Sequence, residues 1–167
     1  MKRYAVLIIL APLFIAALVG CTQKGVLVIE NDTGDILWVS LDGGSEEELE
    51  DGDSLTEEYE LESSVISSED KEVDIEVNGK YKLPEEDTET VLPGDTVTYT
   101  VDADAGAIRI TNNSSYNITG IKVTVTGATS WGSNLLSQAI PPGYYWRLYQ
   151  LAPGGYDIRV EDAYHYS

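Results

Sequence analysis

The sequence contains few of the side chains on which most catalytic sites depend. Its 167 residues include one cysteine, one histidine and one methionine. A lone cysteine excludes an internal disulfide and a zinc site built from thiolates. The histidine, His165, lies close to the C-terminus, where chains fray, so we expect no catalytic triad or metal site around it. No serine lies in a Gly-x-Ser-x-Gly motif, and we expect a protein that is not an enzyme.

Basic residues are scarce as well. The chain has 10 lysine or arginine residues against 29 aspartate or glutamate residues, which gives a formal net charge of −19. Because nucleic acids bind basic surfaces, we expect no nucleic-acid partner.

The N-terminal segment has the features of an export signal. Lys2 and Arg3 precede an apolar run, Ala5–Gly20, that is sixteen residues long and contains Pro12. A bilayer requires about 20 apolar residues, so a cleaved signal is favoured over a membrane-spanning helix. The segment ends in Leu18-Val19-Gly20-Cys21, which holds the chain's only cysteine.

This Leu-Val-Gly-Cys motif resembles the lipobox of bacterial lipoproteins. The resemblance implies cleavage before Cys21, a diacylglycerol on the Cys21 sulfur and acylation of the new amine, for example by palmitate. We expect residues 1–20 to form a signal peptide helix and residues 21–24 a lipidated linker. The protein would then be anchored by lipid to a cell membrane or outer membrane and face the periplasm or the cell exterior. In that family a residue other than aspartate after the cysteine, here Thr22, implies the outer membrane if the host has one.

The remainder of the chain contains one pattern twice, in residues 25–105 (unit one) and in residues 106–167 (unit two). Four landmarks recur in the same order, and we expect insertions only in the turns between them. Gly25–Asn31 matches Gly106–Asn112, Leu37–Leu41 matches Ile121–Val125, Leu49–Gly52 matches Ile140–Gly143, and Val73–Val77 matches Tyr156–Val160.

Apolar residues alternate with polar ones in both units, as in Ile121, Val123 and Val125. A period of two buries one face of a β-strand. Asn78-Gly79 has the composition of a two-residue type I′ hairpin turn before a further strand, Lys80–Leu83. The sequence therefore predicts an all-β protein with two small antiparallel Ig-like β-sandwich units in tandem.

Unit two is predicted to be truncated. In unit one, Lys80–Leu83 and Thr96–Val101 follow the last repeated strand and are expected to close the sandwich. Unit two ends soon after Tyr156–Val160, so an unpaired strand edge is expected beside its core. Three alternatives remain open: Thr96–Val101 fills the gap, a strand of another protein fills it, or Tyr164 and Tyr166 fold back over it.

The two units differ in composition. Unit one has 26 acidic residues and three lysines, whereas unit two has three acidic and four basic residues and most of the aromatic side chains. This division predicts an acidic spacer near the membrane and an aromatic module beyond it. The pattern of residues 106–162, including Trp131-Gly132 and Pro142-Gly143, resembles a small β-sandwich repeat of bacterial envelope lipoproteins. The resemblance implies no catalytic residues.

Two weak ligand sites can be proposed from residue type alone. Asp51 and Asp53 place oxygen ligands in a turn, as a calcium site requires, although a solvated acidic surface is the favoured interpretation. Trp131 and Tyr145 could stack on the sugar rings of a glycan, although Trp131 is more readily explained as a core or plugging residue. Trp146 aligns with Leu55 in unit one and is expected in the core.

These features predict a lipid-anchored, non-catalytic cell-envelope protein that acts as a binding or scaffolding module. Its partners would be the membrane, through the lipid, and another envelope protein or a glycan. One alternative is a glycan-binding module that uses exposed tryptophan and tyrosine. A less favoured alternative is a carboxylate-dependent hydrolase of envelope polymers, which needs a cleft in which one carboxyl group has a raised pKa. No cofactor is expected apart from calcium.

Overall fold

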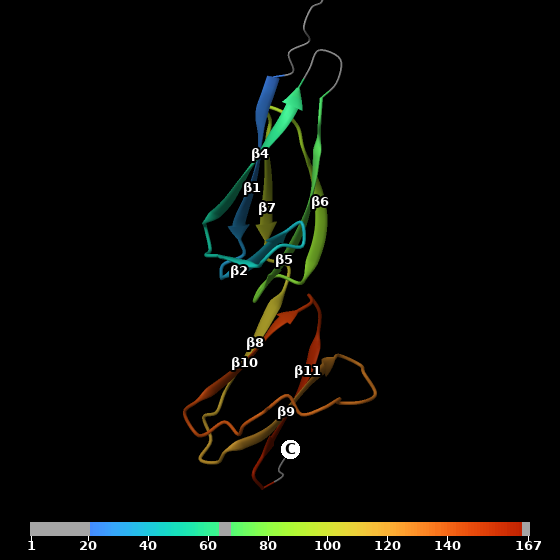
Figure 1. Cartoon of the computed structure of the whole chain (residues 1–167). Coiled ribbons are helices and arrows are strands. Elements are labelled where there is room, and N and C mark those ends of the chain that lie inside the picture. The colour runs from blue at the N-terminus through green and yellow to red at the C-terminus, as the bar shows by residue number, and fades with distance from the viewer. Residues whose placement is uncertain (1–20, 64–67, 165–167) are drawn as a thin grey trace, which may run out of the picture.

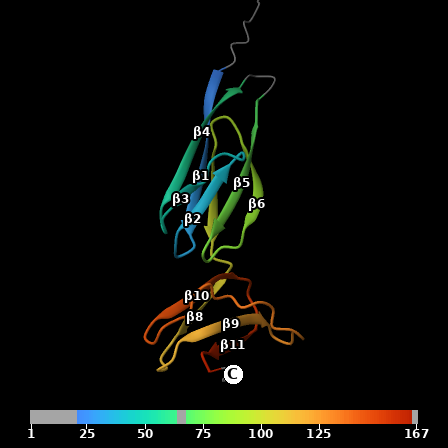
Figure 2. The ribbon, with the colours of Figure 1, turned by 60° about the horizontal axis from the view of Figure 1, so that its bottom comes forward.

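The protein is all-β. The computed structural model describes residues 21–63 and 68–164, and these contain strands and turns but no helix. The predicted signal peptide helix lies outside the described residues. The strands form two sandwich units that follow one another end to end (Figures 1 and 2).

Unit one is a sandwich of two sheets with strands from both ends of its sequence. One sheet has the order β4 (Ser54–Ser63), β1 (Cys21–Asp32) and β7 (Thr96–Asp102), and the other has the order β3 (Glu47–Leu49), β2 (Leu37–Leu41), β5 (Lys71–Gly79) and β6 (Glu85–Val91). All neighbours are antiparallel except β1 and β7, which are parallel. The alternating apolar residues face inward and form a core of eleven buried side chains, among them Leu27, Ile29 and Ile75.

Unit two has two sheets of two strands each. β8 (Gly106–Thr111) pairs antiparallel with β10 (Tyr145–Leu151), and β9 (Ile118–Val125) pairs antiparallel with β11 (Tyr156–Asp162). These are the counterparts of the β1–β4 and β2–β5 pairs, whereas no described strand corresponds to β6 or β7. The buried core of unit two is therefore small. It consists of Ile118, Ile121 and Ile140, with Ile110, Val123, Leu136 and Trp146 packed against them, as expected for Trp146.

The repeat is visible in a buried asparagine turn that both units contain. In unit one, Asn31 Nδ2 donates to the carbonyl oxygens of Asp35 and Leu49, both at 2.8 Å. Its Oδ1 accepts from the backbone N–H (3.0 Å) and the hydroxyl (2.7 Å) of Thr33. The side chain thus bonds four polar groups of the turn, two of which, the Thr33 hydroxyl and the Asp35 oxygen, also bond each other at 3.0 Å. A backbone bond from Gly52 N to the Asn31 oxygen (2.8 Å) joins this turn to the next one.

Unit two repeats this arrangement around Asn112. Its Nδ2 donates to the carbonyl oxygens of Tyr116 and Ile140, both at 2.8 Å, and its Oδ1 accepts from the N–H (3.1 Å) and hydroxyl (2.8 Å) of Ser114. Gly143 N donates to the Asn112 oxygen at 2.7 Å. Gly52 and Gly143 have φ angles of 80° and 82°, a left-handed conformation that favours glycine.

One landmark of the repeat is displaced from its predicted position. Leu37 pairs with Leu49 in unit one, and Ile118 pairs with Ile140 in unit two, so Ile118 rather than Ile121 corresponds to Leu37. The strand β9 contains an irregularity around Gly120, where the register against β11 shifts. An insertion therefore lies inside a strand, and the expectation that insertions occur only in turns was wrong.

The predicted Asn78-Gly79 hairpin is also wrong. Both residues belong to β5 and pair with Trp38 and Leu37 of β2, so the chain turns only after Gly79. Lys80–Leu83 forms the turn rather than a strand, and the strand that follows is β6. Neither central residue has the positive φ that a type I′ turn requires.

Thr96–Val101 belongs to unit one. It forms most of β7 and pairs with Val26–Asn31 of β1, so it does not fill the gap in unit two. Residues at the end of β6 fill the space beside Gly25 in unit one. A Cβ on Gly25 would lie 2.6 Å from Val91 Cγ1 and 2.7 Å from the Leu92 oxygen. At the matching Gly106 the nearest atom would be the Leu151 oxygen at 3.7 Å. Unit two is therefore open where unit one is closed.

The junction between the units is held by hydrogen bonds from β10 to the last residue of β5 and the first residue of the turn that follows it. Gln150 N donates to the Lys80 oxygen at 3.1 Å, and Gln150 Nε2 donates to the Gly79 oxygen at 3.0 Å. The Tyr149 ring meets the Tyr81 ring edge to face, with centroids 6.0 Å apart. On the linker, Asp104 accepts from Lys82 Nζ at 2.7 Å. These contacts orient unit two against unit one.

Candidate functional site

Cys21 lies at the end of unit one that is remote from unit two. It is the first residue of β1, its thiol is free and exposed, and its backbone is in register with Ser63 of β4. Figure 1 shows β1 starting at the end of the molecule opposite β8–β11. A group attached to Cys21 would therefore leave every face of unit two accessible.

The predicted calcium ligands do not form a cation site. Asp51 Oδ1 accepts from Gly34 N at 2.7 Å and thereby links two loops of unit one. Asp53 contributes its backbone, since its carbonyl oxygen accepts from Asn31 N at 3.1 Å. Within residues 21–63 and 68–164, no group of three or more histidine, cysteine, aspartate or glutamate side chains is arranged to hold a metal ion.

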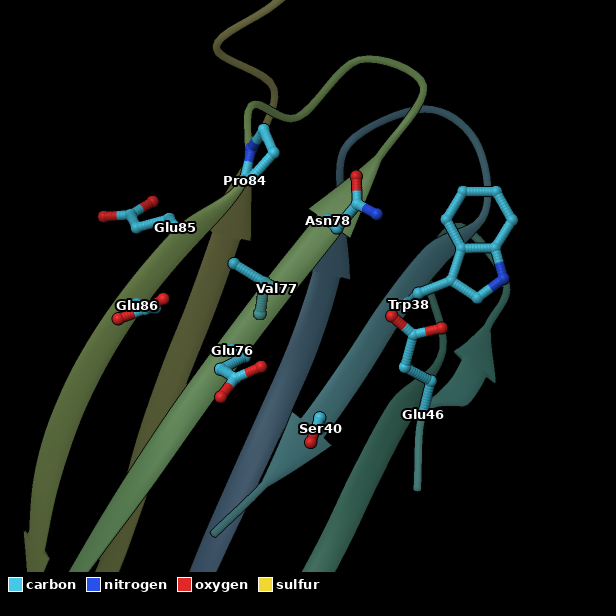
Figure 3. Close-up of a pocket in the computed structure, with 9 residues that line it drawn as sticks. All are labelled: Trp38, Ser40, Glu46, Glu76, Val77, Asn78, Pro84, Glu85 and Glu86. Atoms are coloured by element: carbon cyan, nitrogen blue, oxygen red, sulfur yellow. The ribbon is translucent and has the colours of Figure 1, made fainter. Parts of the chain in front are cut away.

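The outer face of the β3-β2-β5-β6 sheet has a shallow acidic hollow of about 360 Å³ (Figure 3). Figure 3 shows Trp38 and Asn78 at one end, Glu76 and Glu86 on β5 and β6, and Glu46 below Trp38. Glu76 and Glu86 are directly opposite each other in the β5–β6 register, where like charges repel. Such a surface attracts cations diffusely and repels anionic polymers.

Tyr145 lies in a group of side chains that sequence reasoning did not foresee. The guanidinium carbons of Arg109 and Arg147 lie 4.3 Å and 5.1 Å from the centre of its ring. The two arginines are directly opposite each other in the β8–β10 register, and Arg147 also donates to the Tyr149 hydroxyl at 3.1 Å. Among the described residues, neither arginine has an acidic ion-pair partner, although the chain holds 29 acidic residues.

This group, Arg109, Tyr145 and Arg147, combines two cations with an aromatic ring that is 53% exposed. Cation–π contact with the ring keeps the like charges close together. The only sequence signal was the alternation that places Tyr145 and Arg147 on the same side of one strand. Arg109 could be added only from the register between β8 and β10.

Trp131 is not part of the same surface. It is 36% exposed and lies in the loop after β9, outside the buried cluster of unit two. That loop leaves β9 at Val125, which pairs with Tyr156, whereas Tyr145 pairs with Thr111 at the other end of the unit. The two predicted glycan contacts are therefore not brought together, and the plug interpretation of Trp131 has no support from the core.

The shifted carboxyl groups give no sign of a general acid. The pKa values of Asp35 and Asp42 are lowered, first by hydrogen bonds from Lys80 and Lys71, respectively. Burial acts to raise the pKa of Asp104, but hydrogen bonds from Lys82 and from Leu83 N outweigh it, and the net shift is downward. A glycosidase-type acid requires a shift in the opposite direction.

Comparisons of the chain with protein-family models, with curated proteins and with solved structures found no match. Across residues 21–63 and 68–164 there is no helix with the length and hydrophobicity needed to cross a bilayer.

Proposed function

We propose that the protein is a lipid-anchored, non-catalytic protein of a bacterial cell envelope, in which unit one is a spacer and unit two is a binding module. The observation that carries the proposal is the place of Cys21. The only cysteine of the chain follows a lipobox-like motif and is exposed at the end of the molecule farthest from unit two.

The spacer role is supported by the shape and charge of unit one. β1 contains 12 residues, which corresponds to about 40 Å at the rise of an extended strand. The acidic side chains along this unit repel anionic lipid headgroups, which favours an upright position on the membrane. The hydrogen bonds of Gln150 at the junction transmit that orientation to unit two.

A second candidate function is the binding of an acidic glycan by unit two. The observation that favours it is the group Arg109, Tyr145 and Arg147, in which two cations without acidic partners flank an exposed ring. Guanidinium groups bind carboxylates and phosphates in a bidentate manner, and a tyrosine face packs on sugar rings. Replacing both arginines with glutamine should abolish binding of a uronic-acid oligosaccharide, whereas Trp131→Ala should leave it unchanged.

The anchor is tested by replacing Cys21 with serine. Serine has no sulfur to accept the diacylglycerol, so the variant should lose incorporation of labelled fatty acid and move from the membrane fraction to the soluble fraction or remain unprocessed. Thr22→Ser, a neighbouring change that keeps the thiol, is the matched control and should remain with the membrane. The proposal fails if wild-type protein takes up no labelled fatty acid, or if Cys21→Ser takes up as much as wild type.

A further inference from the structure

The outer edge of β11 has no partner strand among the described residues. β11 pairs with β9 on one side only, whereas its counterpart in unit one, β5, pairs with β2 on one side and antiparallel with β6 on the other. Tyr164 does not cover this edge. Its ring packs against Tyr116 with centroids 4.9 Å apart, which places it beside the loop between β8 and β9. Tyr166 lies outside the described residues.

The backbone of β11 presents alternate residues to this open edge. Thr126 N donates to the Gly155 oxygen at 2.9 Å, and this bond fixes which residues face β9. By alternation, Asp157 and Arg159 turn their backbone groups towards β9, and Ile158 turns them outward. The same alternation holds in β5 of unit one. Asp42 N donates to the Asp74 oxygen, so the backbone N–H and C=O of the next residue, Ile75, face β6.

The open edge of unit two also lacks the charges that protect unit one. On β6, the edge strand of unit one, Glu85, Asp87 and Glu89 lie opposite Val77, Ile75 and Val73, so carboxylates occupy the side that faces the core. Inward-pointing charges of this kind prevent pairing between edges. The matching side of β11 carries Ile158 and Val160, which are 43% and 36% exposed.

We propose that the partner of this edge is a second copy of the same chain, with the two β11 strands antiparallel about Ile158. A twofold axis perpendicular to the strand makes the two copies of β11 antiparallel, which is the arrangement that β6 has on β5. Pairing about Ile158 sets Asp157 of each copy opposite Arg159 of the other and Tyr156 opposite Val160. Opposite charges therefore meet on one face of the sheet and apolar side chains on the other.

The charges also select this register over its neighbours. A shift of two residues one way sets Arg159 opposite Arg159 of the second copy, and a shift the other way sets Asp157 opposite Asp157. A shift of one residue brings outward-facing backbone groups against inward-facing ones. Pairing about Val160 sets Arg159 opposite Glu161, but it also sets Ile158 opposite Asp162 and leaves Asp157 without an opposite charge.

The pairing has a geometric consequence for the whole molecule. Figure 1 shows β11 running from the junction towards the end of the molecule that is remote from Cys21. Because the second strand runs the opposite way, the two copies overlap in unit two and their first units extend in opposite directions. The Cys21 residues then lie at the two ends of the dimer, where they would be anchored in separate lipid surfaces.

The test uses charge reversal of the full chain in detergent, with mass measured by analytical ultracentrifugation over a range of concentrations. Wild type should show a reversible monomer–dimer equilibrium. Asp157→Arg and Arg159→Asp should each weaken self-association at least tenfold, because each sets like charges opposite each other. An equimolar mixture of the two variants should form a heterodimer, since every charged pair is then complementary, and the variant with both changes should dimerise as wild type does.

Thr126→Val is the matched control, because it removes the hydrogen bond from the Thr126 hydroxyl to Asp157 Oδ1 (3.3 Å) but keeps the edge charges. It should associate as wild type does. Hydrogen exchange on β9 checks that each variant is folded. Wild type that is monomeric at every concentration, single variants that associate as well as wild type, or a mixture that stays monomeric would overturn the proposal. Cys21→Ser should not alter this association, so a failure of the anchor and a failure of the pairing are distinguishable.

Discussion

The two units share one turn and differ in almost everything that surrounds it. The Asn31 turn and the Asn112 turn make the same four side-chain hydrogen bonds. In each, the asparagine carbonyl oxygen accepts from a glycine in the left-handed conformation, Gly52 or Gly143. Unit one adds a buried core of eleven apolar residues, whereas the described part of unit two has three. The same turn therefore forms in a unit with a large core and in a unit with a small one, so its hydrogen bonds do not depend on the size of the core.

The edge strands of the two units also differ, in the charge of their side chains. The outer strand β4 of unit one carries Glu57, Glu58, Glu60 and Glu62, and β6 carries inward-facing acids. β11 of unit two presents Ile158 and Val160 instead. Acidic side chains on these edges oppose strand pairing between molecules, and the cost is self-repulsion within unit one.

The largest expected effect on stability comes from removing the asparagine side chain that holds the shared turn. Asn31→Ala removes four side-chain hydrogen bonds, each of which contributes about 0.5–1.5 kcal/mol, although the Asp35 oxygen keeps the Thr33 hydroxyl as a donor. Unit one should lose about 3 kcal/mol of unfolding free energy and stay folded. Asn112→Ala should unfold unit two, because its small core cannot offset the same loss. Hydrogen exchange, read separately for β1 and β9, measures both effects.

Matched controls are the exposed neighbours Asp32→Ala and Asn113→Ala, which should change neither unit by more than about 0.5 kcal/mol. Equal losses from Asn31→Ala and Asn112→Ala, with both units still folded, would contradict the view that core size separates the two units.

Alternation and turn composition were sufficient to predict the strands and the repeat. They did not locate the shift between Leu37 and Ile118, because an extra residue near Gly120 leaves the apolar period intact on both sides. The Asn78-Gly79 error has a similar origin. Local sequence favoured a turn, but pairing with Trp38 and Leu37 extended β5 through both residues.

The candidate sites were harder to predict than the strands. Trp131 and Tyr145 were grouped by residue type, and only the register shows that they lie at opposite ends of unit two. The partners of Tyr145 come from β8 and β10, which are far apart in sequence. Asp51 was predicted to be a calcium ligand from its residue type. The hydrogen bond that its side chain accepts from Gly34 N forms only because two loops approach each other, which the sequence does not show.

A smaller effect should follow from screening the charge of unit one. Raising the salt concentration from about 0.01 M to 0.5 M shortens the Debye length from roughly 30 Å to below 10 Å. Unit one, with 26 acidic residues and three lysines, should gain about 1 kcal/mol, or roughly 5 °C in melting temperature. Unit two should change little. Thermal unfolding followed by NMR signals assigned to each unit checks this, and an equal response in both units would show that self-repulsion is not confined to unit one.

The smallest expected effect concerns the carboxyl group that faces both units. The pKa of Asp35 is lowered by the hydrogen bond from Lys80, then by Ile36 N, and further by the charges of Lys80 and Arg147. A carboxyl group with a lowered folded-state pKa contributes stability above its unfolded-state pKa and loses it as the pH falls through the folded-state value. This contribution is therefore lost in acid, below the ordinary value of 3.8.

Three substitutions separate the causes of this shift. Lys80→Met should raise the pKa of Asp35 most, and Arg147→Met should raise it slightly, because Arg147 acts only through its charge. Lys71→Met should raise the pKa of Asp42 and leave that of Asp35 unchanged. Carboxyl carbon NMR between about pH 2 and pH 6, at low ionic strength so that the charge of Arg147 is little screened, measures all three. Since Arg147 belongs to unit two and Asp35 to unit one, an Asp35 pKa that rises in Lys80→Met but not in Arg147→Met would mean that β10 does not hold its charge against unit one in solution.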